Sequence, residues 1–119
     1  MADSLQILAP DGTLVGGRPA LDDSTLHELF VHMLRVRCLD ERMLKLQRAG
    51  RVGFVGTVLG SEAAAIGSAS ALAPEDWLWS GLREGGAAVM RGLPLGEYVA
   101  QMCCNASDTA KEDHETTTE

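Results

Sequence analysis

The sequence predicts a mostly helical chain with a short extended arm at its N-terminus and one short strand. Apolar residues recur at steps of three and four over residues 25–49, as one face of a long helix requires. Short apolar runs on either side of Pro10-Asp11-Gly12 indicate an extended arm with a turn. The apolar run Trp77-Leu78-Trp79 follows a Pro-Glu-Asp turn, and it predicts a short buried strand.

The 119 residues suffice for one modest domain and are too few for most complete cofactor-dependent enzymes with a separate substrate domain. Aromatic residues make up 4% of the chain against 45% apolar residues, so the core must be built from Leu, Val, Ala and Met. We expect an extended arm and loop over residues 1–22 and a domain over residues 23–107. An acidic, disordered tail is expected over residues 108–119, where the chain becomes polar and rich in Thr.

The formal net charge of −7 argues against a general nucleic-acid binder, which usually carries a basic surface. Residues 35–51 are locally basic, which fits either a solvated helix face or a contact with an anionic partner. Three cysteines without CxxC spacing indicate a reducing compartment. Because no apolar run reaches membrane-spanning length and the start resembles neither a signal nor a transit peptide, we expect a cytoplasmic protein without membrane contact.

Four helices are expected. The first runs from about Thr25 to Ala49, with N-cap candidates at residues 22–24 and a C-terminal stop at Gly50. The second, over residues 61–73, consists mainly of small side chains, so it can approach another element closely. Two further helices are expected over residues 83–91 and 95–104, separated by Gly92-Leu93-Pro94.

The search for isolated catalytic motifs finds no phosphate-cradling loop, no nucleophile elbow and no metalloprotease motif. His27 and His32 are five residues apart on one helix, which is poor spacing for two metal ligands, so solvated or core-edge histidines are expected. No basic residue stands beside Cys103 and Cys104 to activate a thiol, and we expect one of them to be buried and the other exposed. The sequence therefore predicts no metal site and no catalytic residue.

One segment suits an anion. Residues 80–86, Ser-Gly-Leu-Arg-Glu-Gly-Gly, combine small residues with Arg83 at the expected start of a helix. Amide groups at a helix start and a guanidinium both favour a phosphate-type anion, although many helix starts are merely capped.

Five phrases, taken together and in order, resemble the start of the alpha subunit of the thiamine-diphosphate-dependent 2-oxoacid dehydrogenases, which act on pyruvate, branched-chain 2-oxoacids or acetoin. The resemblance runs from about Leu26 to Lys111. The phrases are RVRCLDERMLKLQRAGRVGF (35–54), GSEAAAIGSASAL (60–72), EDWLW (75–79), LREGGAAVMRGLPL (82–95) and AQMCCNASDTAK (100–111).

The resemblance implies an α/β parent fold, the thiamine-diphosphate-binding fold, and oxidoreductase chemistry with thiamine diphosphate and magnesium at the contact with a beta-type subunit. In the family, a Tyr-Arg pair helps to hold the diphosphate. Arg83 matches the arginine, while Leu82 replaces the tyrosine, and Gly81 and Leu82 remain as pocket-lining candidates. Glu62 matches the family's Gly-Gln-Glu-Ala phrase, and we expect it to cap or brace the second helix rather than to do chemistry.

The family's metal-diphosphate motif, Gly-Asp-Gly followed by Asn, is missing from these 119 residues. We therefore expect a truncated or split alpha-subunit-like piece that is inactive alone and binds the cofactor weakly or not at all. We expect it to bind a beta-type subunit, or to self-associate as an oligomer, through exposed apolar surface. The alternative is a non-enzymatic interaction or regulatory module that docks onto a dehydrogenase subunit through the long helix and its basic stripe.

Overall fold

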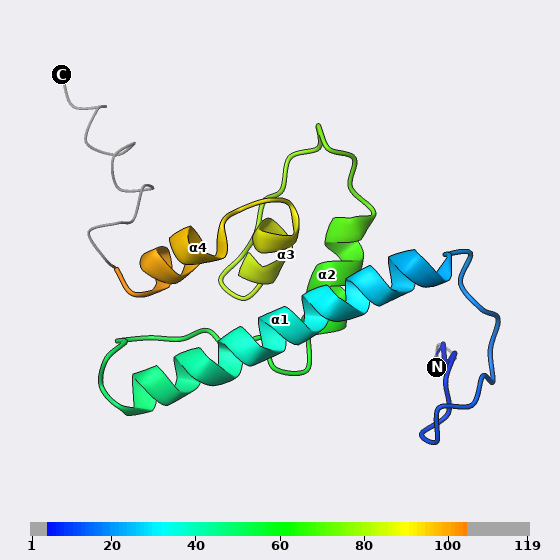
Figure 1. The fold of residues 1–119 in the computed structure, drawn as a ribbon, viewed down its shortest axis with the longest axis horizontal. Helices are drawn as coiled ribbons and strands as arrows, with labels where there is room; N and C mark the ends of the chain where they lie inside the picture. Colours follow the sequence, from blue (N-terminus) through cyan, green and yellow to red (C-terminus); the bar gives the residue numbers. More distant parts are fainter. Residues whose placement is uncertain (1–4, 105–119) are drawn as a thin grey trace.

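The computed structural model describes residues 5–104, whose regular structure is helical (Figure 1). In chain order the helices are α1 (Asp23–Arg48), α2 (Glu62–Ser70), α3 (Gly85–Met90) and α4 (Leu95–Met102). The expectation of a mostly helical chain is confirmed, while the acidic tail expected over residues 108–119 lies outside the described part. None of the described helices is both long enough and apolar enough to cross a membrane.

The N-terminal segment forms a turn where the sequence places Pro-Asp-Gly. Leu8 and Leu14 form an isolated antiparallel bridge, and the amide of Ala9 donates to the carbonyl of Thr13 at 2.8 Å. Gly12 takes a φ of 84°, a left-handed conformation that glycine adopts without steric cost. The expected turn is therefore present.

The ends of α1 are set by residues that the sequence marks. The carboxylate of Asp22 accepts a hydrogen bond from the amide of Thr25 at 2.7 Å and caps the first turn. Hydrogen bonds from Ser24 and Thr25 lower the pKa of Asp22 from its usual 3.8 to about 2. At the other end, Gly50 takes a φ of 71°, which reverses the chain after the last turn.

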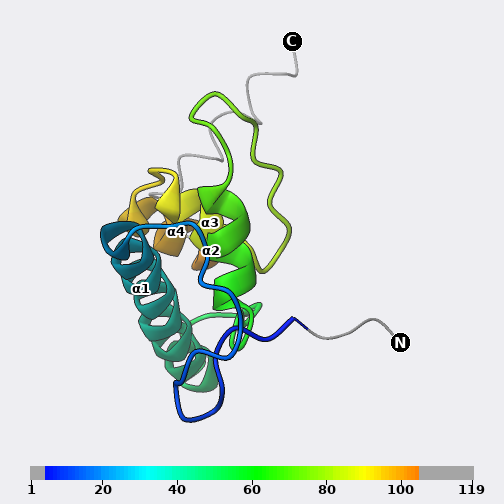
Figure 2. The same cartoon turned by 90° about the vertical axis from the view of Figure 1, so that its right-hand side faces the viewer.

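Helices α2 and α3 pack on one side of α1, and α3 also contacts α4 (Figures 1 and 2). Small residues permit this close approach, because a Cβ on Gly86 of α3 would lie 2.6 Å from Cγ2 of Val36 on α1. A Cβ on Gly85 would overlap the ring of Tyr98 from α4. Helix α3 is thus held between α1 and α4 at its two glycines.

The core is small and lies where α1, α2 and the chain between them meet. Its buried cluster consists of Val36, Val58 and Ile66, and Ile66 is fully inaccessible. Partly buried apolar side chains surround the cluster: Leu29, Met33 and Met90. The expected periodicity of α1 is correct, although Phe30 on the same helix is 52% exposed because the described chain covers its N-terminal half incompletely.

The expectation of a buried strand at Trp77-Leu78-Trp79 is wrong. No strand runs through this segment, and the two tryptophan side chains are 84% and 88% exposed. Their rings contact each other, with centroids 6.0 Å apart. A strand requires a hydrogen-bonding partner, and no segment between residues 5 and 104 pairs with this one.

Three helices are shorter than predicted, and the last of them ends at Met102 rather than at residue 104. The second ends at Ser70 rather than Ala73, ahead of the turn that contains Pro74. The third begins at Gly85 rather than Arg83, and Glu84 takes the N-cap position without a capping side-chain hydrogen bond. Arg83 therefore lies in the loop before the helix, which matters for the site described below.

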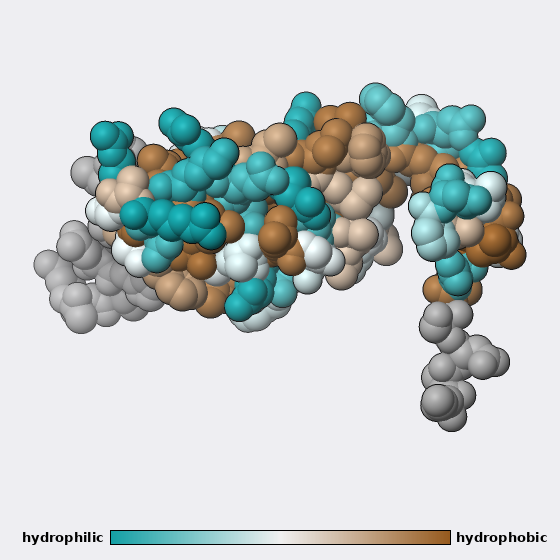
Figure 3. All heavy atoms as spheres, turned by 90° about the horizontal axis from the view of Figure 1, so that it is seen from below, coloured by the Kyte–Doolittle hydropathy of each residue, from teal (hydrophilic) through white to brown (hydrophobic). Residues whose placement is uncertain are grey.

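Apolar side chains reach the surface at several places, and Figure 3 shows such groups among hydrophilic ones on one face. Large exposed apolar side chains lie mainly on the loops and on the N-terminal half of α1. They include Phe30, Leu34, Phe54, Leu59, Trp77, Trp79 and Leu82. This surface is what an incompletely covered part of a larger assembly would present.

The glycine contact between α3 and α1 gives a first prediction. Gly86→Ala places a methyl group against the Val36 side chain and should lower the free energy of unfolding by about 1–3 kcal/mol. Gly67→Ala in α2 is the matched control, because a Cβ there meets nothing within 4 Å and alanine favours helix by up to about 1 kcal/mol. Urea unfolding measures both, and equal stability of Gly86→Ala and the unmodified chain would show that the helices are not packed this closely.

Candidate functional site

The three residues singled out as cofactor contacts lie on the long connection between α2 and α3, against the segment that follows α1. The two segments approach each other closely at Gly56, because a Cβ at this position would lie 3.1 Å from Cγ of Leu82. Only a residue without a side chain fits there comfortably. The packing brings the loops around residues 53–57 and 80–84 side by side.

Arg83 and its two neighbours face different hollows. The guanidinium of Arg83 donates through Nη1 to the backbone carbonyl of Thr57 at 2.7 Å. Arg83 lines a narrow cavity bounded by α1, α3 and α4, with Asp40 and Tyr98 also in its wall. Gly81 and Leu82 instead line a wider, open hollow together with Phe54, Ser80, Gly85, Tyr98, Gln101 and Cys103. The structure thus places the three residues next to one another without directing them into one pocket.

The electrostatics around Gly81 are mixed. A Cβ on Gly81 would lie 2.7 Å from Oε2 of Glu84, so this carboxylate covers the glycine. Helix α3 has six residues, and its N-cap makes no side-chain hydrogen bond. An anion near Gly81 would meet the charge of Arg83 and, at the same time, the opposing charge of Glu84.

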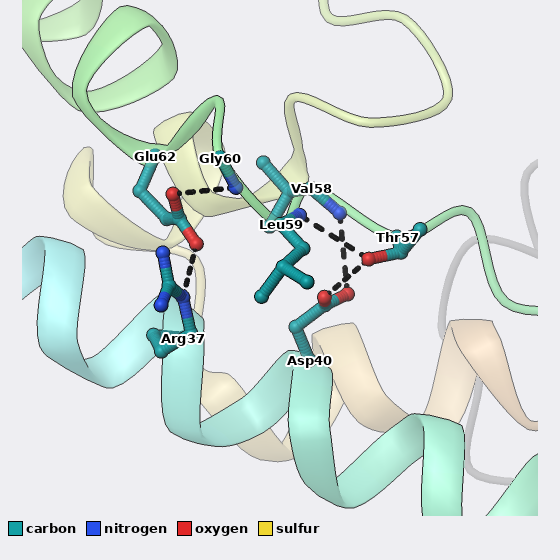
Figure 4. Close-up of polar contacts among 7 residues, drawn as sticks. All are labelled: Arg37, Asp40, Thr57, Val58, Leu59, Gly60 and Glu62. Atoms are coloured by element: carbon teal, nitrogen blue, oxygen red, sulfur yellow. Dashed lines mark hydrogen bonds and ion pairs between the residues drawn. The ribbon is translucent and has the colours of Figure 1, made fainter.

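Two buried carboxylates hold α1 against the chain that follows it (Figure 4). The first is Glu62, at the start of α2, which accepts a hydrogen bond from Nε of Arg37 at 2.5 Å and another from the amide of Gly60 at 3.0 Å. The side chain of Glu62 is 8% exposed and that of Arg37 is 43% exposed. The expectation that Glu62 braces the second helix is confirmed, because it fixes the start of α2 against α1.

The second carboxylate is Asp40, which the sequence analysis did not single out. Its oxygens accept from the hydroxyl of Thr57 at 2.5 Å and from the amide of Val58 at 3.3 Å. The spacing of Asp40 in the sequence indicates its burial. Asp40 follows Val36 by four residues and precedes Met43 by three, so it occupies a core position on the apolar face of α1.

Charge and burial shift the pKa values of Glu62 and Tyr98. The hydrogen bond from Arg37 lowers the pKa of Glu62 from its usual 4.5 to about 2, against the opposing effect of burial. Burial, and then the charge of Asp40, raises the pKa of the Tyr98 hydroxyl above its usual 10.0. Glu62 therefore serves as a fixed anchor at neutral pH rather than as a group poised to exchange a proton.

The histidines and cysteines considered in the sequence analysis lie outside the contacts described so far. His27 is exposed and His32 is half-buried, as predicted for solvated or core-edge histidines. Cys103 is half-buried rather than buried, and Cys104 is exposed. Within residues 5–104 no group of His, Cys, Asp and Glu side chains is arranged to hold a metal ion.

Comparison with known proteins decides the family. The family model described as "Dehydrogenase E1 component" matches residues 31–119. The chain belongs to this family. The match confirms the resemblance drawn from the five phrases, which include the segments that carry Asp40, Glu62 and Arg83.

Curated members of the dehydrogenase E1 component family resemble the chain over most of its length. "Pyruvate dehydrogenase E1 component subunit alpha" of Bacillus cereus is 40% identical over 95 residues, which cover 78% of this chain and 26% of the relative. The protein of the same name from Staphylococcus epidermidis is 39% identical over the same shares. That of Staphylococcus aureus is 38% identical over 97 residues, 80% of this chain and 26% of the relative. The chain thus spans about a quarter of the length of these relatives.

The described residues fit thiamine diphosphate only in part. The guanidinium of Arg83 beside small residues suits the anionic diphosphate. No cluster of metal ligands accompanies it in the described part, and the nearby carboxylate of Glu84 opposes an anion. Arg83 would be the residue to contact the diphosphate, and no group that would hold its magnesium ion accompanies it among residues 5–104.

The Arg37–Glu62 pair gives a second prediction. Glu62→Gln removes a charged acceptor from two hydrogen bonds and should lower the free energy of unfolding by about 1–3 kcal/mol at neutral pH. Urea midpoints of the two proteins measure this difference. A neutral effect would mean that the pair does not fix α2 against α1.

The same pair gives a third prediction, on pH dependence. Because the pKa of Glu62 is lowered by folding, its contribution is complete above about pH 4.5 and is lost as the pH falls through about 2. The stability difference between the unmodified chain and Glu62→Gln should therefore shrink as the pH falls through this window. The comparison also removes the effect of Asp22, which titrates in the same range in both proteins. A difference that stays constant down to about pH 2 would contradict the assignment.

Proposed function

We propose that the chain acts as an alpha-subunit-like part of a thiamine-diphosphate-dependent 2-oxoacid dehydrogenase, in the cytoplasm and together with a beta-type subunit. The observation that carries the proposal is the similarity to pyruvate dehydrogenase E1 alpha subunits over 78% of the chain. The unit to which we assign this role is residues 23–107, preceded by the arm over residues 1–22 and followed by the acidic tail over residues 108–119.

In this role the chain contributes a scaffold and one cation rather than reacting groups. Arg83 is the residue that we assign to the diphosphate, with Gly81 and Leu82 lining the adjoining hollow. Thiamine diphosphate would supply the carbanion chemistry that decarboxylates a 2-oxoacid. The 119 residues should not catalyse this reaction alone, because one guanidinium does not replace a magnesium site.

The proposed partner surface is the apolar surface described above. Trp77 and Trp79 are almost fully exposed in an extended loop, where a neighbouring chain would bury them. Burial of two tryptophan side chains is a large favourable term in association. A beta-type subunit is the proposed occupant, and self-association is the outcome expected without it.

A regulatory module is the second candidate, favoured by the exposed basic side chains of α1 and the loop after it. Arg37 is used by the pair with Glu62. The others lie exposed: Arg35, Arg42, Lys45, Arg48 and Arg51. An acidic surface on a dehydrogenase subunit would complement them.

A fourth prediction tests the cofactor claim. Calorimetric titration of the 119-residue chain with thiamine diphosphate and magnesium should show binding no tighter than about millimolar, because a lone cation supplies little of the energy that a metal site would. Arg83→Ala is the comparison variant and should abolish the residual binding. Tight, magnesium-dependent binding to the isolated chain would overturn the proposal.

A fifth prediction separates the two candidate functions. The chain is combined with a beta-type subunit and with a second polypeptide that carries the metal-diphosphate motif, and decarboxylation of a 2-oxoacid is followed. A part of the enzyme should restore turnover, and Arg83→Ala should reduce it by about tenfold or more, as expected on removing a charged contact to a phosphate. A regulator would instead reduce or redirect the turnover of an enzyme that is already complete.

A further inference from the structure

The buried carboxylate of Asp40 lies one helical turn from Arg37 on the same helix, and its hydrogen bonds are made with other residues than the Arg37–Glu62 pair. Asp40 is 5% exposed and stands between the buried side chains of Val36 and Met43. A carboxylate in such a position is costly unless its oxygens are hydrogen-bonded. The hydrogen-bond donors to Asp40 therefore indicate its structural role.

Those partners belong to one short segment after α1 (Figure 4). Oδ2 of Asp40 accepts from the hydroxyl of Thr57 at 2.5 Å, and Oδ1 accepts from the amide of Val58 at 3.3 Å. The hydroxyl of Thr57 in turn accepts from the amide of Leu59 at 3.2 Å. One carboxylate thus fixes the backbone direction of three consecutive residues.

The backbone carbonyl of Thr57 is the group that receives the guanidinium of Arg83. Its oxygen accepts from Nη1 at 2.7 Å, across 26 positions of sequence. An arginine side chain in an exposed loop loses considerable rotamer freedom when it is held in one place, so a fixed acceptor is required to hold it. Asp40 fixes Thr57, and Thr57 holds Arg83.

We infer that Asp40 is a positioning residue for Arg83, acting through the hydroxyl and the carbonyl of Thr57. This inference rests on the proposed function, in which Arg83 contacts the diphosphate. The chain of contacts runs from the middle of α1 to the loop before α3, and it determines where the one cation assigned to the anion lies. Glu62, by contrast, braces α2 through hydrogen bonds with Arg37 and with the amide of Gly60, so it provides a matched control.

The test compares Thr57→Val, which keeps the shape of the side chain and loses the hydroxyl, with Thr57→Ser, which keeps the hydroxyl. The readout is the ¹⁵N and ¹H spectrum of the Arg83 guanidinium in the labelled full chain, assigned with Arg83→Lys. Glu62→Gln controls for a general loss of stability. Thr57→Val should shift and broaden the Arg83 signals, whereas Thr57→Ser and Glu62→Gln should leave them unchanged.

The opposite pattern overturns the inference. If the Arg83 signals are the same in Thr57→Val and in the unmodified chain, Asp40 does not position Arg83. If Glu62→Gln moves them as much as Thr57→Val does, the effect is general loosening and the inference also fails. Should Thr57→Val not fold, Asp40→Asn replaces it, because it keeps the shape of the carboxylate and removes its charge.

A second readout separates this inference from the proposed function. Titration with magnesium pyrophosphate should give an affinity about fivefold weaker in Thr57→Val than in Thr57→Ser, the change expected on misplacing one hydrogen-bonding group. A changed Arg83 spectrum together with equal, measurable affinities in the two variants would refute the assignment of the diphosphate to Arg83 while the positioning by Asp40 stands.

Discussion

The structure depends on two buried carboxylates, one on the long helix α1 and the other at the start of α2. Glu62 joins α2 to α1 through Arg37, and Asp40 joins the segment before α2 to the same helix. Buried charges are expensive unless every oxygen finds a donor, so these contacts specify one arrangement of the chain after α1 and penalise others. The apolar cluster around Ile66 is too small to specify that arrangement by itself.

The same constraint links the scaffold to the candidate site. Once Asp40 fixes residues 57–59, Leu82 can pack against Gly56, and Arg83 can donate a hydrogen bond to the carbonyl of Thr57. The loop before α3 is anchored from its other side by Arg91, whose guanidinium donates to the carbonyls of Ala73, Pro74 and Asp76. Two arginines thus tie the loop down near its ends, and the exposed tryptophans project between them.

Much of this fold could be predicted from the sequence, and the predictions that failed did so for physical reasons. The periodicity of α1, the cap at Asp22 and the stop at Gly50 are local signals, and the structure confirms them. The buried strand at Trp77-Leu78-Trp79 was predicted from local pattern alone, but a strand requires a partner that the described residues do not provide. Asp40 was not predicted as a core residue because it is acidic, although its spacing from Val36 and Met43 places it on the apolar face of α1. Arg83 was predicted from the small residues around it at an expected helix start and from the family resemblance. Its hydrogen bond to the carbonyl of Thr57 joins residues far apart in sequence and leaves no local signal.

The measurement that tests the central claim most directly is identification of what binds this chain in its own host. The chain is tagged at its N-terminus, kept at its native level and purified, and its partners are identified by mass spectrometry. The account predicts recovery of a beta-type dehydrogenase subunit together with a polypeptide that carries the metal-diphosphate motif. Recovery of the chain alone, or only with proteins unrelated to 2-oxoacid dehydrogenases, would contradict it.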